Sequence, residues 1–190
     1  GMKIMELVAK KILPRDIATK EAFCNTISVE MALGSSTNTV LHLPAIANEA
    51  GIKLDLNLFN EISAKIPNLC KISPAGHHHM EDLDLAGGIS AVMKELEKKN
   101  FLNTNVITVT GDTLKKNIEN SKNLDTEVIR TIDNPYSQNG GIAILFGNLA
   151  PNGAVVKQSA VDKEMFVHKG PAKIFNSEES AMKYILSGKV

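Results

Sequence analysis

Apolar side chains recur every three to four residues through much of the first hundred positions, which is the spacing of an amphipathic helix. The helix limits carry the expected signals. Thr19 and Asp55 belong to the residue types that cap helix starts, and Gly34 and Gly51 to the type that follows helix ends. Five apolar helices are predicted in this way, over residues 2–12, 20–33, 36–50, 55–66 and 89–99.

Short apolar runs predict strands, and they become longer in the last third of the chain. Residues 142–149 and 154–161 are rich in β-branched and apolar side chains and are joined by Ala-Pro-Asn-Gly, a strong turn signal. Asn176 resembles a helix cap and is followed by a predicted helix over residues 177–187. Further short strands are predicted at residues 69–72, 106–109 and 172–175, and a polar surface helix at 113–121. The fold class is therefore α/β: a mostly helical piece followed by a β-rich piece, with the change near Leu124.

Composition narrows the function classes without choosing one. The chain has 190 residues, 21 basic and 21 acidic side chains and a formal net charge of zero, so we expect no nucleic-acid partner. No apolar run approaches the ~20 residues of a membrane span, so we expect no membrane partner. Two cysteines cannot make a disulfide framework and suit a reducing compartment. We therefore expect a cytoplasmic protein.

The most informative segment is residues 34–44, which reads Gly-Ser-Ser-Thr-Asn-Thr-Val-Leu-His-Leu-Pro between two predicted helices. We call its first five residues, 34–38, the elbow. Its hydroxyl and carboxamide groups gather where a helix start leaves backbone N–H groups unpaired, and such a start favours anions. Capping alone explains a hydroxyl at Ser36. The alternative is that Ser36, Thr37 and Asn38 bind a substrate carboxylate or lie beside a cofactor.

The elbow resembles the Gly-Gly-Ser-Thr-Asn-Thr segment of the dihydroxy-acid dehydratase and phosphogluconate dehydratase family. Ser35 stands where that family usually has a second glycine, which adds a side chain at a tight turn. Other blocks resemble the family in the same order, from about residue 13 to residue 190: residues 29–51, Met-Glu-Asp-Leu-Asp-Leu-Ala-Gly-Gly at 80–88, Asp-Asn-Pro-Tyr-Ser at 133–137, and residues 147–157.

The resemblance implies a hydro-lyase that removes water from a 2,3-dihydroxy-3-methyl carboxylate and yields a 2-keto acid in branched-chain amino-acid biosynthesis. It also implies an iron–sulfur cluster that acts on the departing hydroxyl and Mg²⁺ that holds the carboxylate and C2 hydroxyl. The family motifs that carry the cluster cysteines, the magnesium ligands and the base serine are not found here. We therefore expect a central fragment of a longer enzyme, inactive alone, with no catalytic residue, no metal ligand and no bound cofactor.

The resemblance also predicts domains and a partner. Residues 1–124 correspond to the C-terminal portion of the family's N-terminal α/β domain, and residues 125–190 to the first part of its C-terminal β-barrel-like domain. An incomplete sheet leaves unpaired strand edges that recruit other chains. We expect that edge to be covered by a second copy in a homodimer or by the helix at residues 177–187.

Two alternatives to this assignment stay open. Thr39-Val40-Leu41 and the turn at residues 148–153 resemble the branched-chain enzyme, but a sugar-acid dehydratase acting on an aldonate or phosphogluconate is also compatible with the blocks. The other alternative is a stand-alone, non-catalytic binding module.

Two further groups of side chains are of the types that bind metal ions. His77, His78 and His79 precede Glu81, Asp82 and Asp84, but adjacent residues cannot all point one way, and helix capping is the expected role. Cys24 and Cys70 do not stand in the family's ligand motifs, and we expect them to be small buried thiols.

Overall fold

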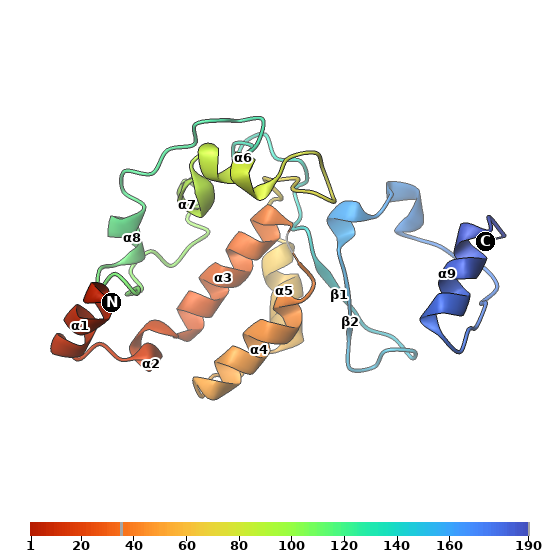
Figure 1. Ribbon diagram of the computed structural model, residues 1–190, viewed down its shortest axis with the longest axis horizontal. Coiled ribbons are helices and arrows are strands. Elements are labelled where there is room, and N and C mark those ends of the chain that lie inside the picture. The colour runs from red at the N-terminus through yellow and green to blue at the C-terminus, as the bar shows by residue number, and fades with distance from the viewer. Residues whose placement is uncertain (35, 190) are drawn as a thin grey trace. The chain divides into compact units, whose positions relative to one another are not determined.

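The computed structural model describes residues 1–34 and 36–189, which fall into two compact units (Figure 1). The first unit is Gly1–Ala160 and the second is Val161–Val190. This division by spatial contacts is distinct from the domain boundary near Leu124, which stays a prediction. No helix in the described part of the chain is long and apolar enough to cross a membrane.

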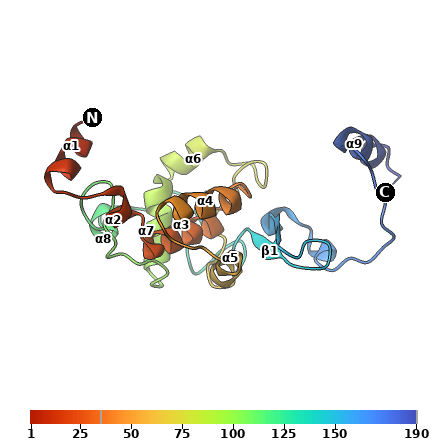
Figure 2. The same ribbon diagram turned by 90° about the horizontal axis from the view of Figure 1, so that it is seen from below.

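Helices dominate the first unit, and α3 (Lys20–Leu33) is central among them because it contacts α4, α5 and α7 (Figures 1 and 2). Thr19 caps α3 by accepting a hydrogen bond from the Ala22 N–H at 3.3 Å, and Gly34 ends it in the left-handed conformation at φ 60°. The other helices of this unit are α1 (Met2–Ala9), α2 (Pro14–Ile17), α4 (Thr39–Glu49), α5 (Leu56–Ser63), α6 (Met80–Leu85), α7 (Gly88–Glu97) and α8 (Leu114–Asn117).

The helices lie at the predicted positions, but some of them are shorter than predicted. The limits of α3 are those predicted, and Asp55 caps α5 through the Asn57 N–H at 2.8 Å. The α4 helix begins at Thr39 rather than residue 36 because residues 36–38 form a separate turn. The predicted helix 113–121 is reduced to the four residues of α8, capped by Thr113.

The strand predictions were too long. In the described chain the sheet consists of β1 (Ala143–Leu145) and β2 (Ala154–Val156), antiparallel, with Ile144 opposite Val155. The predicted strands at 69–72 and 106–109 are represented only by isolated bridges at Ile72 and Ile107, and residues 172–175 are irregular. The mixed α/β class is confirmed, and no closed barrel forms among the described residues.

The outer edge of β1 is covered by α5. The Asn60 side chain pairs with both the N–H and the carbonyl of Ile144 at 2.8 Å, and the Ser63 hydroxyl donates to the Ile142 carbonyl at 2.8 Å. The sequence did not predict this cover of the β1 edge, and the two covers that it did predict, a second copy and the helix at residues 177–187, stay predictions. A side-chain amide substitutes for a neighbouring strand because it offers the same donor and acceptor as a peptide group.

One apolar core holds the first unit together, and it joins helices to the irregular segment after residue 127. It extends from α3, α4, α5 and α7 to residues 128–144. The fully buried members include Ile27, Met31, Phe59, Leu69 and Ile129, each no more than 1% exposed. Residues on both sides of the predicted domain boundary therefore share a core.

The second unit has a different character, since no side chain among its described residues is fully buried. It contains a 3₁₀ turn, η2 (Lys163–Met165), and α9 (Glu178–Leu186). Ser177, rather than the predicted Asn176, caps α9 by accepting from the Ser180 N–H at 3.2 Å. Phe175 and Tyr184 bring their ring centroids to 5.2 Å.

Candidate functional site

The elbow lies on the surface of the first unit, between α3 and α4. Ser36 and Asn38 are exposed and Thr37 is half-buried, whereas Gly34 is buried. Ser35 lies outside the described residues, so its predicted effect on the turn is not placed. The polar side chains that the sequence singled out are thus adjacent and open to a ligand.

Some of the backbone amides of the elbow are already engaged, since the N–H groups of Gly34 and Asn38 donate to partners within the chain. The Ser36 hydroxyl accepts from the Asn38 N–H at 3.2 Å, and the Ser36 carbonyl accepts from the Thr39 N–H at 3.2 Å. The Thr37 carbonyl accepts from the Val40 N–H, also at 3.2 Å. Ser36 therefore caps the turn before α4, and a ligand here would meet the side chains of Ser36, Thr37 and Asn38.

A buried asparagine ties the end of α3 to the rest of the unit. The Asn68 amide nitrogen donates to the Ala32 carbonyl at 3.1 Å, and the Leu69 N–H donates to the same carbonyl at 2.7 Å. Because carbonyls at a helix end lack partners within the helix, these bonds fix where α3 stops. The position of the elbow follows from that end.

Two consecutive glycines after Asn139 bring a distant part of the chain against the elbow. The Gly141 N–H donates to the Met31 carbonyl at 3.0 Å, and a Cβ on Gly141 would overlap the Gly34 Cα. A Cβ on Gly140 would lie 2.7 Å from the Met31 Cβ, so glycine is required at both positions. The sequence analysis missed this contact, although the pair of glycines before a β-rich run is a signal of close backbone approach.

A cationic cluster near Asn68 was also missed. The Lys71 ammonium and the Arg130 guanidinium each lie 5.0 Å from the ring centroid of Tyr136, a cation–π distance. The Tyr136 hydroxyl and the Glu127 carboxylate raise the pKa of Arg130 above its ordinary value. The Tyr136 hydroxyl donates to the Glu127 carbonyl at 3.0 Å, which fixes the ring.

The histidine run contributes to structure. His79 is the cap residue of α6, and its backbone N–H donates to the Asp82 carboxylate at 2.7 Å. The rings of His77 and His78 lie 4.1 Å apart. Within residues 1–34 and 36–189, no three histidine, cysteine or acidic side chains are grouped so that they could hold a metal ion. The predicted capping role is confirmed for His79.

Both cysteines are free thiols and neither is activated. Burial raises the pKa of Cys70 to about 12, and that of Cys24 is raised by partial burial. A thiolate is the form that binds metal or attacks an electrophile. Cys70 is 1% exposed, as predicted for a packing thiol, and Cys24 is half-buried.

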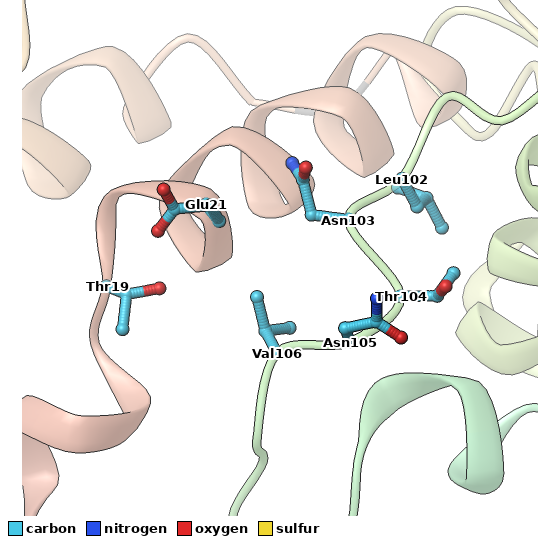
Figure 3. Close-up of a pocket in the computed structure, with 7 residues that line it drawn as sticks. All are labelled: Thr19, Glu21, Leu102, Asn103, Thr104, Asn105 and Val106. Atoms are coloured by element: carbon cyan, nitrogen blue, oxygen red, sulfur yellow. The ribbon is translucent and has the colours of Figure 1, made fainter.

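One hollow of the first unit lies away from the elbow (Figure 3). Its volume is about 510 Å³, and it separates Thr19 and Glu21 at the start of α3 from residues 102–106. Asn25 fixes that loop, because its amide pairs with the Asn103 N–H at 2.7 Å and the Asn103 carbonyl at 3.0 Å. The elbow residues do not line this cavity.

Comparison with known proteins places both parts of the chain in one family. Residues 1–117 match the model of the dihydroxy-acid/6-phosphogluconate dehydratase N-terminal domain. Residues 127–190 match the model of the C-terminal domain of the same family.

Curated relatives extend the match over the whole chain. A dihydroxy-acid dehydratase of Acetivibrio thermocellus is 65% identical over all 190 residues, and one of Carboxydothermus hydrogenoformans is 60% identical over the same span. A third, from Ruminiclostridium cellulolyticum, is 57% identical. In each case the match covers 100% of this chain and 34% of the relative, so the chain spans about a third of the length of these proteins.

Proposed function

This chain belongs to the dihydroxy-acid/6-phosphogluconate dehydratase family, and from that membership we propose that the protein containing it is a dihydroxy-acid dehydratase. Such an enzyme would dehydrate 2,3-dihydroxy-3-methyl carboxylates to 2-keto acids in branched-chain amino-acid biosynthesis. The observation that carries the proposal is 65% identity over all 190 residues to a protein of that name. A sugar-acid dehydratase is the second candidate, because the family model also includes 6-phosphogluconate dehydratases.

The elbow is the part of this chain that we assign to substrate binding. Ser36 and Asn38 are exposed and Thr37 is half-exposed, so two hydroxyls and one carboxamide face a ligand without rearrangement of the core. These groups donate and accept hydrogen bonds, as the hydroxyls and carboxylate of a dihydroxy acid require. No catalytic residue is assigned.

The iron–sulfur cluster and Mg²⁺ that the family implies do not fit the residues of this chain. Two thiols with raised pKa values offer poor cluster ligands, and the described residues contain no metal-ligand group of three. We therefore propose that the ligands of both groups lie elsewhere in the whole enzyme, and no chemical step is derived through them. We also propose that the whole enzyme is a homodimer and that it is cytoplasmic. The two free thiols support the second of these proposals, because free thiols suit a reducing compartment.

Genetic complementation tests the proposal and separates its alternatives. The whole gene should restore growth without branched-chain amino acids to a strain that lacks its own dihydroxy-acid dehydratase. Restoration of growth on a sugar acid alone would favour the second candidate. A gene whose reading frame encodes only these 190 residues and restores neither would favour a binding module.

Variants of the elbow test the assigned residues. In the whole enzyme, Ser36→Ala with Asn38→Ala should raise KM for the dihydroxy acid by at least about tenfold, since the loss of even one hydrogen bond to a charged group costs about 1.5–3 kcal/mol. Asn48→Ala removes an exposed carboxamide from the far end of α4 and serves as the matched control. An unchanged KM in the double variant would leave capping as the only role of the elbow.

A further inference from the structure

Ser159 carries a hydroxyl that is buried and has no hydrogen-bond partner among the described residues, although the residue as a whole is half-buried. Buried hydroxyls are nearly always bonded, because the loss of water is otherwise uncompensated. An orphaned one therefore requires an explanation, and a ligand that is absent from the chain alone is one.

The position of this hydroxyl links it to the elbow. The Ser159 N–H donates to the Gly141 carbonyl at 3.2 Å, and Gly141 is in backbone contact with Gly34, the first residue of the elbow. A Cβ built on Gly34 would lie 3.2 Å from the Ser159 Oγ. Ser159 thus approaches the elbow from the segment that follows the β-hairpin.

The turn that carries Ser159 is held firmly. It is η1 (Gln158–Ala160), and the Gln158 side-chain nitrogen donates to the Gly140 carbonyl, to the Ser63 hydroxyl at 3.2 Å and to the Ile142 carbonyl at 3.3 Å. Polar contacts to α5 and to the glycine pair therefore fix the backbone on the N-terminal side of Ser159. The hydroxyl is placed by this framework rather than by a loose loop.

We propose that Ser159 is a further ligand-binding residue of the elbow site, and that its hydroxyl donates a hydrogen bond to a carboxylate oxygen of the dihydroxy acid. This proposal rests on the proposed function. Rotation about the Cα–Cβ bond redirects a serine hydroxyl between three staggered positions. Because the residue is half-buried, such a rotation can turn the oxygen toward a ligand without moving the backbone. The substrate site would then be shared between Ser36–Asn38 and the segment matched by the C-terminal family model.

Ser159→Ala distinguishes this role from a structural one because the two predict opposite effects. If the hydroxyl serves a ligand, its removal relieves an unsatisfied group, so the Tm of the 190-residue chain should stay equal or rise. The same change should raise the KM of the whole enzyme about tenfold with a smaller change in kcat. Ser63→Ala is the matched control for stability, because its hydroxyl is bonded to the Ile142 carbonyl at 2.8 Å, and its loss should lower the Tm.

A binding measurement keeps the proposal separate from the proposed function. A 2,3-dihydroxy-3-methyl carboxylate is titrated into the ¹⁵N-labelled chain, and the amide shifts of Gly34, Asn38 and Ser159 are followed in the wild type and in Ser159→Ala. Saturable shifts whose dissociation constant is about tenfold higher in the variant than in the wild type support the proposal even if the whole enzyme turns over another acid. A lower Tm, an equal dissociation constant in both proteins, or no saturable shift would overturn it.

Discussion

Asn60 of α5 and Ile144 of β1 form a closed pair: the Asn60 Nδ2 donates to the Ile144 carbonyl and the Ile144 N–H donates to the Asn60 Oδ1, both at 2.8 Å. Ile144 is 4% exposed, so neither of its backbone groups can rely on water instead. The pair joins residues from the segments that the two family models match separately. The hairpin is therefore held to the helical part by polar contacts as well as by the core.

Asn60→Ala should destabilise the chain by about 2 kcal/mol or more, because each buried backbone group left without a partner costs about 1–3 kcal/mol. Urea unfolding followed by circular dichroism measures the change. Asn57→Ala, an exposed asparagine on the same helix, is the control and should change the free energy of unfolding by no more than about 0.5 kcal/mol. Equal effects of the two variants would show that the amide pair is not important for stability.

Gly141→Ala should destabilise the chain by about 1–3 kcal/mol or prevent its folding, because the added methyl group overlaps the Gly34 backbone, which cannot move aside as a flexible side chain would. Gly147→Ala is the control, since nothing lies within 4 Å of a Cβ at that position. Soluble yield and the midpoint of urea unfolding report the difference. A Gly141→Ala chain as stable as the Gly147→Ala chain would contradict the close approach of residues 34 and 141.

The contribution of the buried Cys70 thiol to the free energy of unfolding should fall at alkaline pH. Its pKa is raised by burial from 9.0 to about 12, so the folded chain keeps the proton through a range where the unfolded chain loses it. Stability from the protonated thiol is therefore complete below pH 9 and declines as the pH rises toward 12, by at most about 1.4 kcal/mol per pH unit.

Comparison with Cys70→Ala separates the pH-dependent contribution of the Cys70 thiol from the contributions of other titrating groups. The wild type should exceed the variant in free energy of unfolding at pH 7, and the difference should shrink at pH 10 and again at pH 11. Cys24→Ala, at a half-buried thiol, should show a weaker dependence. A difference between wild type and Cys70→Ala that is constant with pH would contradict the buried, protonated thiol.

The sequence indicated the local features well. The limits of α3, its Thr19 cap, the Asp55 cap of α5 and the left-handed Gly34 all follow from rules that involve neighbours a few residues apart. The predicted strands were too long because their ends, Phe-Gly-Asn-Leu at residues 146–149 and Lys-Gln-Ser-Ala-Val at residues 157–161, include residue types that are depleted in strands and have no neighbouring strand to pair with.

The long-range features could not be derived in this way. Asn60 and Ile144 are 84 positions apart, and nothing in an exposed-looking asparagine on an amphipathic helix indicates a backbone partner at that distance. The elbow residues were found through composition and resemblance, whereas Ser159 carries no signal of its own. Its significance depends on Gly34 and Gly141 meeting in space.

The central claim is that this chain is part of a dihydroxy-acid dehydratase, and the most direct measurement is the activity of the purified whole protein. With cofactors reconstituted under anaerobic conditions, it should convert a 2,3-dihydroxy-3-methyl carboxylate to the 2-keto acid with a kcat/KM at least about tenfold above its values for an aldonate and for 6-phosphogluconate, a margin of about 1.4 kcal/mol in transition-state stabilisation. A kcat/KM that is highest for the sugar acid, or no turnover of any of the three acids, would contradict it.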